Sequence, residues 1–271
     1  GIGERAFYDK AFLKKVTVPE VVTSIGESAF AASSNIEEIN LPAGITSIST
    51  NAFTGCYAKF FCPKDSTTAK LLSPRSFFDT NDTDTVFELL YVKTNSEEEN
   101  PSVLTLYKYH GNKKVIDFFP ERVTRIYNNA FKDNEVITSV TIPADVTEIG
   151  SSAFSGCTNL AEINADGSQL HTIGTNAFKD CLSLTALELS DNIQTIGTDA
   201  FSGCPEGLKI YCGATSDTAK AISRTPYDFY TQVLGNEFRM RWDGSGNVLT
   251  LLECTGTRTI VTVSDVHVIA A

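Results

Sequence analysis

The sequence is poor in histidine, methionine and tryptophan. It has three histidines, one methionine and one tryptophan among 271 residues. His110 falls in a predicted strand, His171 in a turn and His267 in the C-terminal tail. Catalysis needs titratable groups that converge, and nothing in the sequence brings two of these histidines together. Each is interpreted as a surface residue.

Basic residues are scarce relative to acidic ones. The 22 lysines and arginines against 33 aspartates and glutamates give a formal net charge of −11. This balance argues against nucleic acid, which needs a basic footprint, and against insertion into or binding to an anionic membrane. No apolar run approaches the length of a membrane span. We therefore expect an acidic, soluble surface that resists self-association, and a monomer.

Motifs of known reaction classes are missing as well. The sequence has no G-x-S-x-G, H-E-x-x-H or phosphate loop, and no C-x-x-C pair for zinc or redox chemistry. Residues 243–247 resemble a calcium loop but lack the distal glutamate, so we interpret them as a hairpin turn. Residues 97–99, three glutamates, read as a solvated turn. No catalytic residue, metal site or cofactor is predicted.

The sequence does contain one motif that recurs along most of the chain. An Ala-Phe or related pair repeats at spacings of 23, 23, 78, 23, 24 and 23 residues. The repeated phenylalanines are Phe7, Phe30, Phe53, Phe131, Phe154, Phe178 and Phe201. A fixed period of this size is typical of a solenoid, in which each unit buries its apolar face against its neighbours. We expect each repeat phenylalanine to fill the interior of the coil.

Short alternating runs accompany the phenylalanines, at residues 13–18, 36–41, 137–142 and 184–189. Alternation at period two predicts a short strand with one buried face. Pro19, Pro42 and Pro143 follow three of these runs and end the strands, since proline cannot donate to a ladder. The single 24-residue spacing is explained by one extra residue in the turn at residues 166–169.

Two segments close the repeat blocks. Residues 58–77 are predicted to form a strand, a polar turn and a short helix, and residues 208–227 repeat the same sequence pattern. Ser66 and Ser216 are the expected helix N-caps. Because each copy follows the last repeat of a block, we interpret both as caps over the open apolar end of the stack.

Each cap is followed by a predicted β-meander, at residues 86–120 and 237–265, with one turn at Gly111 or Gly256. The predicted domains are a repeat block with its cap at 1–85, a meander at 86–119, a second block with its cap at 120–235, and a meander opening a truncated third module at 236–271. The chain opens inside a repeat, so it looks like an excised fragment, and the absence of a targeting segment is uninformative.

Most of the seven cysteines follow the repeat. One position, three residues after the phenylalanine, holds Ser33, Cys56, Asn134, Cys157, Cys181 and Cys204. Such a column indicates a small inward side chain that bonds the backbone of a turn, which favours buried free thiols. A Cys56–Cys62 or Cys204–Cys212 disulfide is the alternative.

The candidate binding residues are the outward positions of the predicted strands. Stacking aligns them as a column across each block. They are Lys15, Thr17, Glu38, Asn40, Ser139, Thr141, Glu162, Asn164 and Glu188, with Ala186 on the same face. The three glutamates make this face acidic. We hypothesise that this face binds a protein ligand of complementary basic charge. The alternative is that it is a solvated surface with no binding role.

The repeat motif resembles the BspA-like leucine-rich repeats of bacterial cell-surface proteins. The residues that carry it are IPADVTEIGSSAFSGCTNL, at 142–160, with its copies, and the closing segments and meanders are similar to that family. The resemblance implies an α/β solenoid, a right-handed leucine-rich-repeat coil, that is exported and displayed on the cell surface. It also implies binding to other macromolecules, since members have been linked to adhesion to host matrix proteins and cells. Lys10, Tyr127 and Ser190 depart from the repeat pattern.

Two function classes follow. The first is a non-catalytic extracellular or cell-surface module for protein interaction or adhesion. The second is a structural spacer or stalk that displays another domain of a longer surface protein. A binding module should retain a partner from matrix or cell-surface extracts, and a spacer should not.

Overall fold

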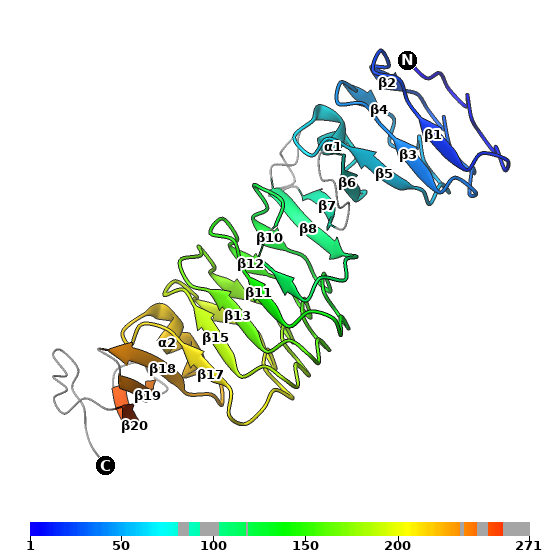
Figure 1. Cartoon of the computed structure of the whole chain (residues 1–271). Coiled ribbons are helices and arrows are strands. Elements are labelled where there is room, and N and C mark those ends of the chain that lie inside the picture. The colour runs from blue at the N-terminus through cyan, green and yellow to red at the C-terminus, as the bar shows by residue number, and fades with distance from the viewer. Residues whose placement is uncertain (81–86, 93–102, 118, 234–235, 243–248, 257–271) are drawn as a thin grey trace. The chain divides into compact units, whose positions relative to one another are not determined.

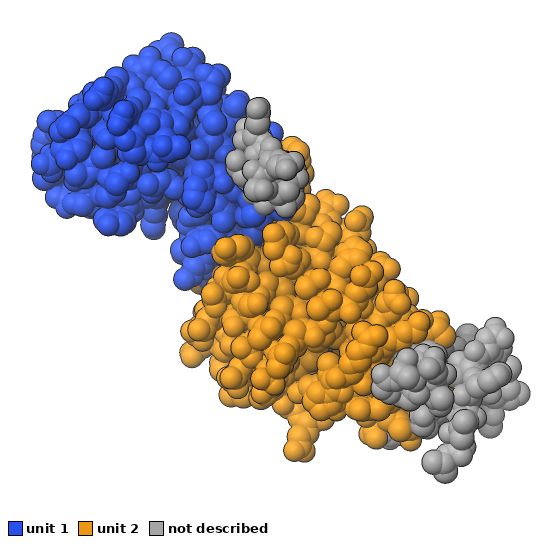
Figure 2. Space-filling model, turned by 180° about the vertical axis from the view of Figure 1, so that it is seen from behind, with its two compact units in different colours: residues 1–111 blue, residues 112–271 orange. Residues whose placement is uncertain are grey.

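The protein is described by a computed structural model over residues 1–80, 87–92, 103–117, 119–233, 236–242 and 249–256. The chain forms two compact units, Gly1–Gly111 and Asn112–Ala271, which Figure 2 colours separately. Each unit is a β-solenoid of repeats with little helix in its described part (Figure 1). The predicted repeat solenoid is therefore confirmed. No helix in the described ranges is both long and apolar enough to cross a membrane.

Unit 1 has two ladders. The longer strands run in the order β1-β3-β5-β6-β7-β8, parallel as far as β6 and antiparallel from there, and the short strands β2 and β4 pair in parallel. The elements are β1 (Lys15–Thr17), β2 (Ser24–Ile25), β3 (Glu38–Asn40), β4 (Ser47–Ile48), β5 (Lys59–Cys62), α1 (Thr67–Leu71), β6 (Phe77–Asp79), β7 (Phe87–Val92) and β8 (Val103–Tyr109).

Unit 2 repeats this plan with more turns of coil. One parallel ladder runs β9-β11-β13-β15-β17-β18 and continues antiparallel into β19 and β20, and the other runs β10-β12-β14-β16. The elements are β9 (Val115–Ile116), β10 (Arg125–Ile126), β11 (Ser139–Thr141), β12 (Glu148–Ile149), β13 (Glu162–Ala165), β14 (Thr172–Ile173), β15 (Ala186–Leu189), β16 (Thr195–Ile196), β17 (Lys209–Tyr211), α2 (Asp217–Ile222), β18 (Phe229–Val233), β19 (Asn236–Trp242) and β20 (Leu249–Gly256).

The repeat phenylalanines form a stack of rings inside each unit, as the sequence predicts. In unit 2 the centroids of successive rings from Phe131 to Phe201 lie 4.7, 5.3 and 5.8 Å apart, and the planes differ by less than 10°. Phe30 and Phe53 in unit 1 stack at 5.5 Å. The rings are buried, so the stack excludes water from the interior of the coil and fixes the spacing of the repeats.

The two short helices begin where the serine residues predict. Ser66 Oγ accepts a bond from the Ala69 N–H at 3.1 Å, and Ser216 Oγ accepts one from the Ala219 N–H at 3.0 Å. These bonds satisfy donors that the first turn of a helix leaves unpaired. Both N-cap predictions are confirmed.

The third strand expected in the first meander, within residues 86–120, forms, but the expectation that it pairs inside the meander is wrong. After Gly111 the chain forms β9, which pairs in parallel with β11 instead of returning against β8. The reason is that Ile116 is buried beside Val140 and supplies an inward residue to the first turn of coil in unit 2. Four other features predicted from the sequence lie outside the described residues: the turn at 95–100 with its glutamates, the loop at 243–247, His267, and the third strand of the second meander. The division into four domains stays a prediction.

Candidate functional site

The candidate binding face is formed by the longer strands, in which residues alternate between core and solvent. In unit 2, Val140, Ile163 and Leu187 are fully buried, so the residues on either side of them face outward. Parallel pairing in register aligns two outward rows: Ser139, Glu162 and Ala186 in one, and Thr141, Asn164 and Glu188 in the other. The structure therefore brings the predicted residues of unit 2 together.

Unit 1 carries the same two rows on a smaller scale. They hold Lys15 beside Glu38, and Thr17 beside Asn40. Lys15 Nζ lies 2.5 Å from Glu38 Oε2, and Lys14 Nζ lies 3.2 Å from Glu37 Oε1. Exposed pairs of this kind contribute little stability, but they neutralise the carboxylates. The face of unit 1 therefore has no excess of negative charge at these rows.

The rows of unit 2 keep their negative charge. Glu162 and Glu188 are exposed, and no lysine or arginine of the described residues forms an ion pair with either. The nearby ion pair of Arg125 with Glu148, at 2.7 Å, lies on the other ladder. A basic partner would thus meet carboxylates on unit 2 that have no cation of their own.

A shallow hollow of about 330 Å³ opens beside Glu188. Its lining includes Asp166, Asp191, Tyr211 and Tyr230, and the two tyrosine rings have centroids 5.8 Å apart. Sequence reasoning missed this hollow because its tyrosines come from β17 and β18, beyond the last repeat. Carboxylates beside aromatic faces suit a cationic side chain.

The tyrosines of this hollow are held by a charged network. Tyr211 Oη donates to Glu237 Oε2 at 2.5 Å, and Lys209 Nζ donates to Glu237 Oε1 at 2.6 Å. Burial opposes ionisation of Glu237, but these two hydrogen bonds outweigh it and hold the pKa of the carboxyl below its ordinary value. Glu237 therefore stays ionised and fixes Tyr211 at the edge of the hollow.

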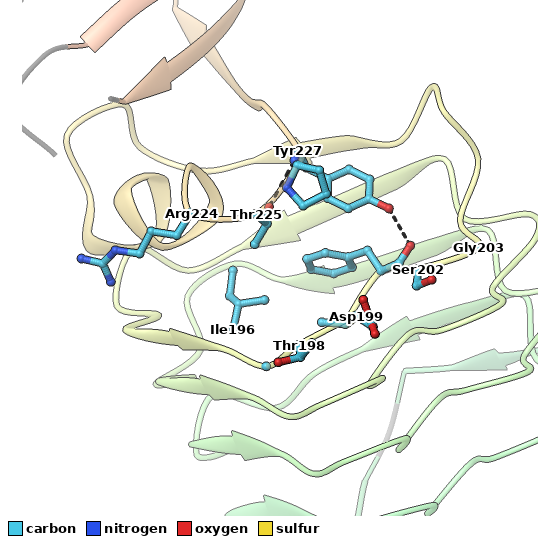
Figure 3. A pocket seen from close by; sticks show the side chains of 12 residues that line it. Ile196, Thr198, Asp199, Ser202, Gly203, Arg224, Thr225 and Tyr227 are labelled. Carbon is cyan, nitrogen blue, oxygen red and sulfur yellow. Dashed lines mark hydrogen bonds between the residues drawn. The ribbon is translucent and has the colours of Figure 1, made fainter. Parts of the chain in front are cut away.

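A second cavity, of about 500 Å³, lies on the side of the Phe-centred turns (Figure 3). The turn of the last repeat, from Ile196 to Gly203, forms one side, and Arg224, Thr225 and Tyr227 form the other. Tyr227 Oη donates to the Phe201 carbonyl at 2.7 Å. None of the predicted binding residues lines this cavity.

Titratable groups of the kind used in catalysis do not converge in the described part of the chain. His110 Nε2 lies 2.7 Å from Glu88 Oε2 in unit 1, and His171 is exposed in unit 2. No set of three or more histidine, cysteine or carboxylate ligands placed to hold a metal ion occurs among the described residues.

Comparison with known families identifies the repeat. The model of the BspA type leucine rich repeat region matches residues 1–83 and 107–217, in six copies. The chain belongs to the BspA-type leucine-rich repeat family. The matched residues include every Phe-centred turn and all the predicted binding residues, so the face described above is built from family repeats. No curated protein matches the chain significantly.

Solved structures of bacterial leucine-rich repeat proteins resemble the chain. A leucine rich cell surface protein from Faecalibacterium prausnitzii is 26% identical with a TM-score of 0.41, over 77% of this chain and 56% of that one. A leucine-rich repeat protein from Bacteroides capillosus is 22% identical with a TM-score of 0.39, over 47% of this chain and 94% of that one. The chain thus spans little more than half the length of the Faecalibacterium protein. The TM-scores are low, so family membership rests on the repeat match.

The described cysteines of this leucine-rich repeat chain are free thiols. The six cysteines whose side chains are described are unbonded, so neither alternative disulfide forms. Cys157, Cys181 and Cys204 each point a thiol at the phenylalanine carbonyl of the preceding repeat, at 3.1 to 3.2 Å. Ser33 Oγ donates to the Phe7 carbonyl at 2.7 Å. The predicted column of small side chains that bond a turn is confirmed.

Burial makes these thiols unreactive. It raises the pKa of Cys157 to about 12 and that of Cys204 to about 11, and raises the pKa of Cys181 further still. Because the thiolate is the nucleophile and the metal ligand, these cysteines remain protonated at neutral pH. Their hydrogen bonds to phenylalanine carbonyls join successive repeats of the solenoid.

Proposed function

We propose that this leucine-rich repeat protein is a non-catalytic, cell-surface or extracellular interaction module that serves adhesion to host matrix or to cells. The strand rows of unit 2, from Ser139 to Glu188, bind a protein ligand of basic charge. The observation that carries the proposal is the pair of exposed, unneutralised carboxylates of Glu162 and Glu188, in neighbouring strands of one rigid ladder.

The hollow beside Glu188 supports the same assignment. Asp166 and Asp191 add two exposed carboxylates to it, and Tyr211 and Tyr230 offer aromatic faces. A lysine or arginine of the ligand would place its cation between these groups and its apolar stem against the rings. Tyrosine is also a frequent anchor of protein interfaces.

A binding assay with charge-reversed variants tests the proposal. The immobilised chain is exposed to extracts of host matrix and of cell surfaces, and captured proteins are identified and their affinities measured. Glu162→Lys with Glu188→Lys should weaken binding of a captured ligand at least tenfold, which corresponds to about 1.4 kcal/mol. The loss should shrink as ionic strength rises, because exposed charges are screened by salt.

The matched control is Glu135→Lys with Glu206→Lys. These glutamates are also exposed and give the same change in net charge, but they lie in turns outside the strand rows. The control should bind as the parent does. Equal binding by both double variants and the parent would overturn the proposed face. Failure to capture any ligand under these conditions would favour the spacer, which has no partner of its own.

A further inference from the structure

The turns around the repeat phenylalanines form a third ladder of hydrogen bonds. In each turn, alternate N–H groups donate to carbonyls of the next repeat. The N–H groups of Asn176, Phe178 and Asp180 donate to carbonyls at 198, 200 and 202, at 3.0, 2.8 and 2.8 Å. Earlier turns of unit 2 pair in the same way: Phe131 N–H donates to the Ala153 carbonyl at 2.7 Å.

The last turn of unit 2 leaves this ladder open. The equivalent donors are the N–H groups of Asp199, Phe201 and Gly203, and no acceptor for them is found among the residues that the structure describes. The intervening N–H groups, of Ala200 and Ser202, bond within the turn at 3.3 and 3.1 Å. Strand β16, which leads into the turn, is the last of its ladder.

The closing segment covers the apolar core without covering these donors. Tyr227 lies edge-on against the Phe201 ring, with centroids 5.5 Å apart and planes at 80°, in the place where the next phenylalanine would stack. Its hydroxyl donates to the Phe201 carbonyl, so it satisfies an acceptor and not a donor. The 500 Å³ cavity of Figure 3 is lined by residues of this segment and of the open turn.

The open edge already has the conformation that binds a neighbouring repeat elsewhere in the unit. Asp199 and Gly203 have φ of 56° and 79°, and the corresponding residues of the previous turn, Asn176 and Asp180, have 56° and 58°. A ligand would therefore meet three preformed donors at alternate residues. Donors fixed before binding reduce the ordering that association requires.

We propose that this edge is a docking site for a peptide segment of a partner protein, which adopts the same turn conformation and adds one more rung to the turn ladder. Carbonyl groups at alternate residues of the peptide accept from the N–H groups of Asp199, Phe201 and Gly203. Recognition is through the main chain, as in other cases where a peptide extends an exposed edge. The site is distinct from the strand rows of Glu162 and Glu188.

The cavity also restricts the side chains of the peptide. The residue that faces Phe201 must be small, because Tyr227 occupies the stacking position of a further aromatic ring. Arg224 and Asp199 place one charge of each sign among the lining residues, so the site imposes no requirement for net charge. A peptide that copies residues 197–203, with alanine in place of phenylalanine, is a suitable probe.

Amide hydrogen exchange of the full chain, followed by NMR, tests the site. Without peptide, the amides of Asp199, Phe201 and Gly203 should exchange at least about a hundred times faster than those of Asn176, Phe178 and Asp180, which are bonded. With the acetylated and amidated probe peptide at millimolar concentration, exchange of the three open amides should slow about tenfold, while that of Ala200 and Ser202 is unchanged.

Ser202→Trp fills the cavity and should abolish this protection. The matched control, Ser155→Trp, changes the same position of an earlier turn whose ladder is already occupied, and should leave the protection intact. The same peptide made of D-amino acids should protect nothing. Three results would each overturn the proposal: slow exchange of the three amides in the free chain, no protection by the peptide, or protection that survives Ser202→Trp. The first two are measured on the parent chain, so they decide the question even if a variant does not fold. Protection that appears on raising the concentration of the chain alone would also overturn it, in favour of a second copy as the occupant.

Discussion

Single polar residues close each unit by bonding backbone groups that the coil would otherwise leave unpaired. In unit 2, Thr218 Oγ1 donates to the Ser190 carbonyl at 2.5 Å and accepts from the Ile193 N–H at 2.9 Å. In unit 1, Thr68 makes the equivalent bonds at 2.5 and 3.1 Å. Both threonines are fully buried. A buried threonine therefore pairs a backbone N–H and a backbone carbonyl at the end of each repeat block.

Thr218→Val should destabilise the protein by about 1–3 kcal/mol, because it leaves a buried N–H and a buried carbonyl unpaired while preserving the shape of the side chain. Urea denaturation measures the change. Thr195→Val, at an exposed position of β16, is the control and should shift the midpoint little. A midpoint for Thr218→Val equal to that of this control would contradict the role of the hydroxyl.

The cysteine column makes stability depend on alkaline pH. Burial raises the pKa of Cys157 to about 12 from the ordinary 9.0. The unfolded chain therefore releases this proton first, so the thiol contributes its full stability below pH 9.0 and loses it as pH rises toward the folded value. The free energy of unfolding should fall between about pH 9 and pH 12.

Cys157→Ser isolates that contribution. Serine already fills the column at Ser33 with a hydrogen bond of the same kind, and its hydroxyl does not titrate in this range. Urea denaturation under reducing conditions should therefore give a shallower decline with pH for the variant than for the parent. Parallel declines would show that Cys157 does not hold its proton in the folded state.

The residues of the repeat could be predicted, and those of the hollow could not. A column occupied by cysteine, serine and asparagine indicates a small inward group, and the bond of Cys157 to the Phe131 carbonyl confirms it. Tyr211 pairs in register with Glu188 and so continues its row, but Tyr211 on β17 and Tyr230 on β18 lie outside the alternating runs from which the candidate residues were taken. The ion pair of Lys15 with Glu38 depends on side-chain conformations that a sequence pattern does not specify.

At the scale of elements, the turn that carries the phenylalanine determines how repeats stack. Phe154 lies between Phe131 and Phe178, with ring centroids 4.7 and 5.3 Å away. Glycine at the start of the turn permits this approach: a Cβ at Gly174 would lie 2.6 Å from the Ser151 backbone nitrogen. The equivalent position in the first Phe-centred turn of unit 2 is occupied by Tyr127. A side chain fits there because no earlier Phe-centred turn of the unit packs against it.

Phe154→Ala should destabilise the protein by about 3–5 kcal/mol, because it removes a fully buried ring and leaves a cavity between two others. Chemical denaturation followed by circular dichroism measures it. Phe12→Ala removes the same side chain from a position that is 78% exposed, and should change the midpoint little. Equal midpoints for Phe154→Ala and the parent would contradict the stacked core.

The strands and helices were predictable where they belong to the repeat. The alternating runs mark β11 and β15, and the serine caps mark α1 and α2. The exception is β9, whose residues Val115 and Ile116 fit either a meander strand or a repeat strand. Only the pairing of Ile116 with Val140 distinguishes them, and pairing partners far apart in the chain are not encoded in local alternation.

At the scale of the whole molecule, one plan occurs twice: stacked turns of coil, a closing segment with a short helix, and antiparallel strands. The phenylalanines and cysteines that define the repeat lie inside each unit and hold it together. The charged residues give the chain a net charge of −11. In the strand rows of unit 2, Glu162 and Glu188 form no ion pair with a lysine or arginine among the described residues, which is the basis for assigning the binding role to that face.

The central claim is that the carboxylates of Glu162 and Glu188 contact the ligand. Carboxyl footprinting measures this directly: the chain is labelled with a carbodiimide and a glycine ester, alone and with a ligand captured from matrix or cell-surface extracts, and each labelled residue is quantified by mass spectrometry. The claim predicts that the ligand suppresses labelling of Glu162 and Glu188 while Glu135 and Glu206 label as before. Unchanged labelling of Glu162 and Glu188 in the saturated complex would contradict it.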